Sequence, residues 1–262
     1  MIKPLERRQK IVKDIDTFED NHIVLRLSQK YGVSEMTIRR YLKVLEDSGL
    51  IKRTYGGAVR WPTVQVEPPL LARDKRLPLA TDQKTRIARF AAQNLVQSRD
   101  IIIIEGGTTA TAMVPYVADW DDLTVVTNGL ATAEELRRQL PWSATLLCPG
   151  GILRPDSCTF VGHIAERFFR EFHAHRLFLS ATGLTLREGI TDPNILEIQV
   201  KRAMIQSAHE VVLLLDSSKF GVRSLMKVID WSEVHLLVTD DAAPADMLDA
   251  LRAQGVEVVI AQ

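Results

Sequence analysis

Four consecutive isoleucines at residues 101–104 are followed directly by Glu-Gly-Gly-Thr-Thr at residues 105–109. An apolar run without polar alternation is typical of a strand that is buried on both faces, as in parallel α/β sheets. Glycines let the chain turn sharply and approach a ligand closely, and Thr108 and Thr109 can cap a helix that begins there. Because the free N–H groups of a first helical turn attract anions, this loop is a candidate phosphate site. It matches neither common phosphate-loop motif, so an ordinary turn remains the alternative.

The same alternation of apolar runs and helical patterns continues beyond this stretch. A helix expected from Thr81 leads into the isoleucine run, and later apolar runs are separated by helical patterns: LTVVT, ATLLC, RLFLS, VVLLLD, VHLLVT and VEVVI. This order predicts an α/β fold over residues 81–262, with a doubly wound, mostly parallel, Rossmann-like sheet that has helices on both faces.

Five loops at the ends of the predicted strands are rich in small and polar residues. Ligands of such sheets bind beyond the C-terminal ends of the strands. Hydroxyls, backbone N–H groups and a lysine suit a polyhydroxylated, phosphorylated small molecule, although each loop alone could be an ordinary turn. The candidate ligand-binding residues are Glu105, Gly106, Gly107, Thr108, Thr109, Thr127, Asn128, Gly150, Gly151, Ser180, Gly183, Asp216 and Lys219.

The first sixty residues differ in charge from the rest. They hold 13 Lys and Arg against 8 Asp and Glu, whereas residues 61–262 hold 20 against 25, and the whole chain has no net charge. This split predicts a small basic module that meets a polyanion, joined to a larger domain that does not.

The pattern of residues 1–61 predicts a winged helix-turn-helix. Amphipathic helices are expected over residues 5–15, 22–31 and 35–48, with Gly32 ending the second and Ser34 capping the third. Strand-like runs at 50–54 and 58–61 surround Tyr-Gly-Gly and predict a hairpin that lies along the phosphate backbone. A tight turn between two helices, with basic residues on the second, is the pattern that places a helix in the major groove.

The third helix carries the candidate DNA-reading side chains. Apolar residues share one face of its helical wheel and basic residues the opposite face. Arg39 and Lys43 are like charges four residues apart, whose repulsion a phosphate partner would relieve, although a solvated charged face is the alternative. With the wing included, the candidate DNA-binding residues are Ser34, Met36, Thr37, Arg39, Arg40, Lys43, Lys52, Arg53 and Tyr55.

The stretch VSEMTIRRYLKVLEDSGLIKRTYGGAV resembles the N-terminal signature of the DeoR family of bacterial transcription regulators, and the resemblance covers most of residues 5–60. The stretches IIIIEGGTTA, VVTNGL, FLSATGLTLREGITD, VKRAMI and LLLDSSKFG are similar to the effector domain of that family. That domain shares its fold with ribose-5-phosphate isomerase, glucosamine-6-phosphate deaminase and the CoA transferases. The resemblance implies sugar-phosphate binding at Gly107, Thr108, Thr109, Thr127, Asn128, Gly151, Gly183 and Lys219.

Three residues depart from the pattern of the family. Tyr41 stands where an aspartate normally follows the paired arginines, and Tyr55 where a histidine normally precedes Gly-Gly. We expect both to alter which operator is read. Glu105 stands where the family usually has aspartate, so its reach toward a sugar hydroxyl would differ.

The remaining features are expected to be structural. Four prolines in residues 62–80 predict a linker whose Arg73, Lys75 and Arg76 are expected to be solvated, with contact to DNA as the alternative. Cys148 and Cys158 form no metal-binding pattern and are expected to be free thiols in a reducing cytoplasm. No apolar stretch is long enough for a membrane span. We expect no catalytic residue, metal or cofactor.

Three functions fit this sequence. The favoured one is a cytoplasmic regulator, a repressor of a carbohydrate-utilisation operon that binds double-stranded operator DNA as a dimer or tetramer and responds to a sugar phosphate. The second is a sugar-phosphate isomerase or deaminase fused to a DNA-binding module, with Glu105 or Asp216 as the base. The third is an architectural DNA-binding protein without an effector response.

Overall fold

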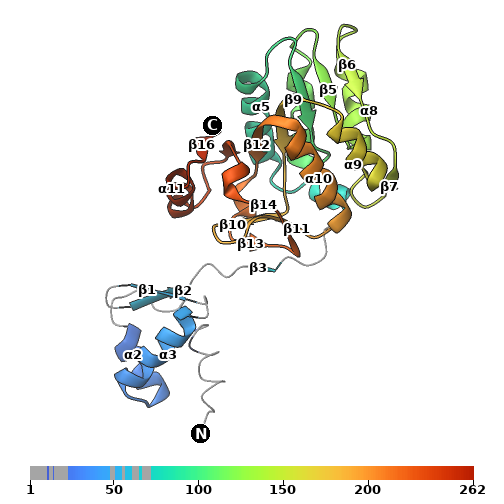
Figure 1. Cartoon of the computed structure of the whole chain (residues 1–262). Coiled ribbons are helices and arrows are strands. Elements are labelled where there is room, and N and C mark those ends of the chain that lie inside the picture. The colour runs from blue at the N-terminus through green and yellow to red at the C-terminus, as the bar shows by residue number, and fades with distance from the viewer. Residues whose placement is uncertain are drawn as a thin grey trace. The chain divides into compact units, whose positions relative to one another are not determined.

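The computed structural model describes residues 11, 14, 23–47, 51–54, 57–60, 65–66 and 72–262, with side chains for 11, 14, 23–45 and 72–262. The chain divides into two compact units, residues 1–64 and 65–262 (Figure 1). The boundary lies within the stretch that the prolines mark as a linker, and residues 65–80 belong to the larger unit. No helix among the described residues is long and apolar enough to cross a membrane.

The smaller unit contains the two helices and the hairpin that the sequence predicts. Helix α2 spans Ile23–Tyr31 and α3 spans Glu35–Asp47, and strands β1 (Ile51–Thr54) and β2 (Gly57–Arg60) pair antiparallel. Gly32 between the helices has a φ of +60°, a conformation that glycine adopts at little cost. A small core packs Ile11 and Leu27 against Ile38 and Leu42 of α3. Most of the helix predicted over 5–15 lies outside the described residues.

The larger unit is built on a seven-stranded sheet in which every pairing is parallel. Its spatial order is β16-β15-β12-β9-β4-β5-β6. The strands are β4 (Ile101–Ile104), β5 (Thr124–Val126), β6 (Thr145–Leu147), β9 (Ala174–Leu179), β12 (Ala208–Leu214), β15 (Leu236–Thr239) and β16 (Glu257–Ile260). The predicted doubly wound sheet is therefore confirmed.

Helices cover both faces of this sheet (Figure 1). Successive strand residues point to opposite faces, so Ile102 and Ile104 pack into one core while Ile103 packs into the other. One face carries α5 (Thr81–Leu95), α6 (Thr108–Thr111), α7 (Val114–Val117) and α8 (Leu130–Gln139). The other carries α9 (His163–Arg170), α10 (Ile195–Ser207) and α11 (Ala245–Ala253).

Several short elements were not predicted from the alternation of apolar runs. An antiparallel sheet joins β10 (Gly183–Thr185), β11 (Gly189–Asp192) and β14 (Met226–Ile229), and β7 (Ile152–Arg154) pairs with β8 (Thr159–Val161). Within residues 65–80, strand β3 (Gln65–Val66) pairs with β13 (Val222–Arg223), and α4 spans Arg73–Arg76. Two 3-10 turns, η1 (Ser217–Lys219) and η2 (Trp231–Glu233), complete the described elements.

The strand order reverses between β4 and β9. From β4 the chain builds outward through β5 and β6, then returns to the other side of β4 and continues through β9, β12, β15 and β16. The crevice at such a reversal is where doubly wound sheets bind their ligands. A ligand is therefore expected at the loops that follow β4, β9 and β12.

Candidate functional site

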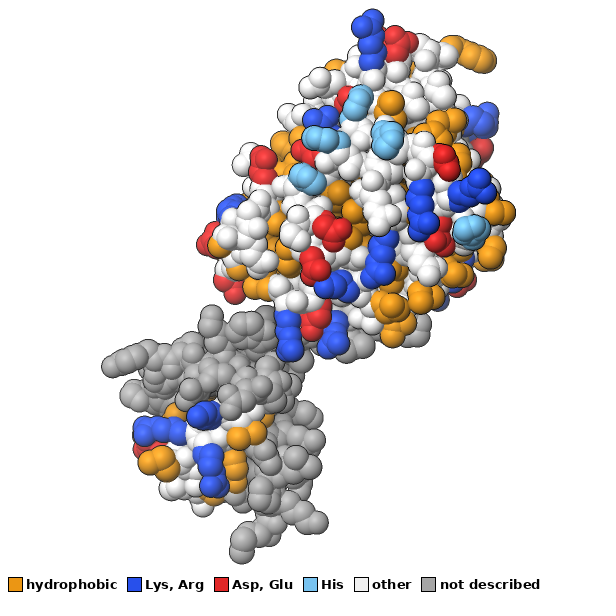
Figure 2. All heavy atoms as spheres, viewed as in Figure 1, with side chains coloured by type: hydrophobic (Ala, Val, Ile, Leu, Met, Phe, Trp, Pro, Cys, Tyr) orange, Lys and Arg blue, Asp and Glu red, His pale blue; other side chains and the backbone are white. Residues whose placement is uncertain are grey.

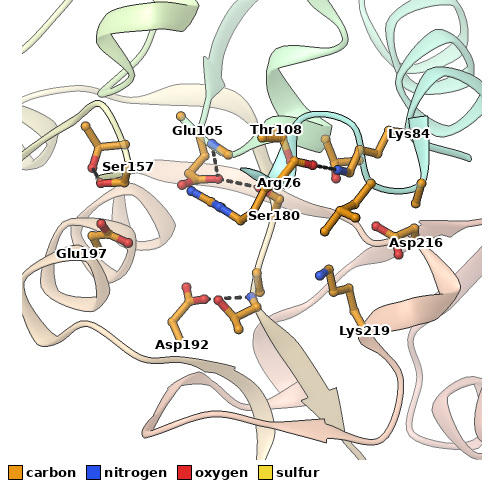
Figure 3. Close-up of a pocket in the computed structure, with 18 of the residues that line it drawn as sticks. Arg76, Lys84, Glu105, Thr108, Ser157, Ser180, Asp192, Glu197, Asp216 and Lys219 are labelled. Carbon is orange, nitrogen blue, oxygen red and sulfur yellow. Dashed lines mark hydrogen bonds between the residues drawn. The ribbon is translucent and has the colours of Figure 1, made fainter. Parts of the chain in front are cut away.

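A cavity of about 120 Å³ lies at this reversal point. One ordered water needs roughly 10–15 Å³ measured in this way, so the cavity has room for a ligand of several non-hydrogen atoms. Its walls come from the loops after β4, β9 and β12, from α10 and β11, and from residues 76–84 (Figure 3). The lining residues are Arg76, Leu79, Ala80, Lys84, Glu105, Gly106, Gly107, Thr108, Thr109, Ser157, Thr159, Ser180, Ala181, Thr182, Asp192, Glu197, Lys201, Asp216, Ser218 and Lys219.

A buried lysine organises one side of the cavity. Lys201 projects from α10 and its Nζ lies 2.5 Å from Oδ2 of Asp192, 2.7 Å from the carbonyl oxygen of Ser180 and 3.6 Å from Oε1 of Glu105. Burial alone would lower the pKa of Lys201, but the carboxylates of Asp192 and Glu105 outweigh burial and raise it above its ordinary value. Lys201 is therefore a charged group that fixes two carboxylates in the wall.

The carboxylate of Glu105 is held by its own loop and by the loop after β9. Its Oε2 accepts hydrogen bonds from the backbone N–H of Gly107, at 2.9 Å, and from the hydroxyl of Ser180, at 2.7 Å. A Cβ on Gly107 would overlap the Ser180 hydroxyl, so this close approach requires glycine. Glu105 is one methylene longer than the aspartate that the DeoR family usually has at this position. Its carboxylate uses this length to reach Gly107 and Ser180 within the protein.

The opposite side of the cavity carries an excess of positive charge. Figure 3 shows Lys84, Asp216 and Lys219 gathered there, and the side chain of Arg76 running from that side toward the side of Glu105. Asp216 accepts hydrogen bonds from the backbone N–H and the hydroxyl of Ser218. Among the described residues, no carboxylate forms an ion pair with Arg76, Lys84 or Lys219. Burial lowers the pKa of Lys84 from its ordinary value, and only Asp216 opposes that shift.

The structure brings together eight of the thirteen residues that the sequence singled out for ligand binding. Glu105, Gly106, Gly107, Thr108, Thr109, Ser180, Asp216 and Lys219 line the cavity. All of them follow β4, β9 or β12, the strands beside or next to the reversal point.

Five of the thirteen lie outside the cavity wall. Thr127 and Asn128 follow β5, and their side chains accept hydrogen bonds from the backbone N–H groups of Gly129 and Gly106. Gly150 and Gly151 follow β6, the edge strand on that side, and neither lines the cavity. Gly183 packs against the backbone of Val222, where a Cβ would not fit. Hydrogen bonding accounts for Thr127 and Asn128, and close packing for Gly183.

Nine polar lining residues are absent from the list of candidates. Lys84 lies on α5, Glu197 and Lys201 lie on α10, Asp192 ends β11, Ser157 precedes β8, Thr159 begins β8, and Thr182 and Ser218 lie in the loops after β9 and β12. Arg76 belongs to the stretch that was expected to be a solvated linker. A charged residue at helical spacing among apolar ones, as in ILEIQVKRAMI, was the available signal for Lys201. The expectation of solvation is also wrong for Arg73, which is only 7% exposed.

The predicted DNA-reading residues of α3 form one continuous exposed surface. Met36, Thr37, Arg39, Arg40 and Lys43 border the same shallow depression. Figure 2 shows Lys and Arg side chains on the described part of the smaller unit. Arg39 forms an ion pair with Glu35 at 3.1 Å. The charge of Glu35 therefore offsets part of the repulsion between Arg39 and Lys43.

Two further contacts concern the start of α3 and its buried face. The Ser34 hydroxyl accepts from the backbone N–H of Thr37, at 3.3 Å, as expected of a cap. Tyr41 is only 7% exposed and packs in the core of the smaller unit; its effect on which operator is read stays a prediction. Lys52 and Arg53 lie on β1, whose side chains are not described, and Tyr55 lies outside the described residues.

Comparisons with known proteins agree with this division into two units. A DeoR-like helix-turn-helix domain matches residues 7–63, and a DeoR C terminal sensor domain matches residues 79–241. The chain is 34% identical to a putative aga operon transcriptional repressor of Escherichia coli O157:H7, covering 97% of this chain and 93% of that one. It is also 34% identical to the HTH-type transcriptional regulator GolR of Listeria innocua, covering 99% of both.

Among solved structures, ribose 5-phosphate isomerase A of Methanocaldococcus jannaschii aligns with 53% of this chain and 54% of its own, at 15% identity and a TM-score of 0.38. A similarity of this size carries no functional conclusion. The functional conclusion comes from the family matches and from the two full-length relatives. They indicate a DNA-binding regulator with a sensor domain rather than an enzyme. The chain therefore belongs to the DeoR family of transcription regulators.

Proposed function

We propose that this protein represses a carbohydrate-utilisation operon and that a phosphorylated sugar, bound in the cavity at the β4/β9 reversal point, controls its affinity for operator DNA in the cytoplasm. The names of two relatives, an aga operon repressor and the regulator GlpR of Haloferax volcanii, support a role in transcription control. The nature of the ligand rests on the cavity itself.

The observation that carries the proposal is the separation of charge within the cavity. On one side Lys84 and Lys219 lie with the carboxylate of Asp216, and the side chain of Arg76 extends from there toward Glu105; a phosphate dianion would balance the charge of these three cations. On the other side the carboxylates of Glu105 and Asp192, fixed by Lys201, offer acceptors for hydroxyl groups. A ligand with a phosphate at one end and hydroxyls at the other fits both sides.

The test is a thermal-shift screen of the full-length protein against sugar phosphates and the same sugars without phosphate. A ligand at a hundred times its Kd stabilises the folded state by about 2.7 kcal/mol, so binding raises the melting temperature measurably. Only the phosphorylated member of the matching pair should do so. The shift should shrink in Lys219→Ala and stay unchanged in Arg252→Ala, which removes a charge from the exposed face of α11. Equal shifts from a sugar and its phosphate would contradict the proposal.

We also propose that the protein binds DNA as a dimer or tetramer assembled through residues 81–262. One helix-turn-helix reads a short site, and two modules related by symmetry read half-sites about 34 Å apart or at multiples of that spacing. Sedimentation of the free protein and of its operator complex tests this. A monomer that binds its operator tightly would contradict it.

A further inference from the structure

The chain that leaves the DNA-binding unit is attached to the walls of the cavity at two places. Strand β3, which begins the larger unit at Gln65, pairs with β13, and β13 begins at Val222, three residues after Lys219. Further on, the backbone N–H of Arg73 donates to the carbonyl oxygen of Asp156 at 2.7 Å, and Nζ of Lys84 donates to the carbonyl oxygen of Arg76 at 2.7 Å. The described residues of this segment, 65–66 and 72–80, are therefore held against the larger unit.

One side chain of this segment enters the cavity. Arg76, the last residue of α4, lines it, and Figure 3 shows its side chain extending between the labelled groups on the two sides. Its Nε is buried and has no hydrogen-bond acceptor. A buried charged donor without an acceptor costs free energy of folding, so an anion that accepts a hydrogen bond from this Nε would bind favourably.

The surroundings of Arg76 leave that acceptor to a ligand. Two other cations, Lys84 and Lys219, line the side of the cavity from which the Arg76 side chain extends, and the carboxylate of Asp216 on that side is engaged by Ser218. Burial is the main cause that lowers the pKa of Lys84, and the positive charges of Lys219 and Arg76 lower it further. An oxyanion placed among them relieves the repulsion and satisfies Nε of Arg76 at once.

We propose that Arg76 binds the phosphate of the effector and that, because Arg76 lies on the segment leading to the DNA-binding unit, this contact transmits occupancy of the cavity to that unit. The inference rests on the proposed function, since it assigns the phosphate of the same ligand. In the empty protein the segment is held by β3 and by the backbone contacts of α4. In the occupied protein the phosphate adds a charge-assisted contact that holds residues 65–80 more firmly against the sensor domain. A ligand acts on DNA binding through this difference between the two states.

Three variants of the full-length protein separate the role of Arg76 from a general loss of charge. Arg76→Gln removes the charge and the guanidinium fork and leaves a neutral amide, Arg76→Lys keeps the charge and loses the planar fork, and Lys75→Gln is the matched control on the exposed side of α4. The contact with Lys84 is made by the backbone of Arg76 and survives these changes. Inorganic phosphate, and each sugar phosphate of the thermal-shift panel, is titrated by calorimetry at constant ionic strength.

We expect Arg76→Gln to weaken phosphate binding by about tenfold or more, the usual effect of losing a hydrogen bond to a charged group. Arg76→Lys should fall between Arg76→Gln and the wild type, and Lys75→Gln should match the wild type. Hydrogen exchange supplies the second measurement: ligand should slow amide exchange in residues 65–80 of the wild type and of Lys75→Gln, but not of Arg76→Gln.

The outcomes distinguish this inference from the function on which it rests. Wild-type affinity in Arg76→Gln, with affinity lost in Lys219→Ala, would overturn the role of Arg76 and leave the proposed effector site standing. Binding that needs Arg76 without any change of exchange in residues 65–80 would overturn the transmission. If the wild type binds neither inorganic phosphate nor any sugar phosphate, the proposed function fails and the inference fails with it.

Discussion

Lys201 and Asp192 form a buried ion pair, with 2.5 Å between Nζ and Oδ2 and side chains only 6% and 3% exposed. The pair joins α10 of the large three-layer core to the end of β11 in the small antiparallel sheet. Because Lys201 also donates to the carbonyl oxygen of Ser180, it ties the loop after β9 to both. The wall of the cavity and the junction of the two sheets thus depend on one ammonium group.

Replacing Lys201 by methionine should destabilise the protein by about 3–5 kcal/mol, because it leaves the carboxylates of Asp192 and Glu105 buried without their cation. Chemical unfolding followed by circular dichroism measures the change. Adding Asp192→Asn to Lys201→Met should recover part of the loss, since the remaining buried charge is smaller. Strictly additive effects of the two single changes would show that the ion pair does not couple these positions.

A second prediction compares two glycines. A Cβ on Gly107 would overlap the Ser180 hydroxyl and come within 2.6 Å of Oε2 of Glu105, whereas the nearest atom to a Cβ on Gly150 is 4.0 Å away. Gly107→Ala must therefore break the hydrogen bond between Ser180 and Glu105, and we expect it to cost about 1–3 kcal/mol of stability and to weaken ligand binding. Gly150→Ala is the matched control and should change neither. Thermal unfolding with and without ligand tests both, and similar behaviour of the two variants would refute this account of the loop.

The third prediction concerns operator DNA, found by selection from random duplexes. Arg40 is exposed on α3, so Arg40→Ala should cost about 1–3 kcal/mol of operator binding if its guanidinium reads a guanine. Lys43→Ala should weaken binding to all sequences and reduce the slope of log affinity against log salt by about one. Gln29→Ala, on the exposed face of α2, is the control for both variants. Fluorescence anisotropy measures the DNA affinity of all three. Unchanged affinity in Arg40→Ala would remove α3 from its assigned role.

The sequence predicts the main sheet and part of the cavity because both depend on local patterns. Buried parallel strands appear as apolar runs such as residues 101–104, and the loops that follow them hold Gly106, Gly107, Ser180 and Lys219. The sequence could not tell which of five loops meet at the reversal point, because that depends on the order of strands in space. It also could not place Arg76, whose segment is short, proline-rich and ordered by contacts with residues far away in the chain.

The last prediction concerns pH and rests on Lys84. Burial lowers the pKa of Lys84 below its ordinary value of 10.5; Asp216 opposes this, and Lys219 and Arg76 add to it. In the empty protein, the lysine therefore loses its proton at a lower pH than in the unfolded chain. Charging Lys84 disfavours the folded state below that lowered pKa, so stability should rise as pH increases from there to about 10.5.

A bound phosphate reverses this preference, because it favours the charged form of Lys84. Ligand affinity should therefore fall as pH rises through the lowered pKa, over a range in which the phosphate itself stays a dianion. Calorimetric titrations at a series of pH values above 7.5 should show this fall in the wild type. Lys84→Arg keeps its charge throughout the range and should lose the pH dependence while still binding ligand. An identical fall in the wild type and in Lys84→Arg would mean that another group titrates and that Lys84 does not face the phosphate.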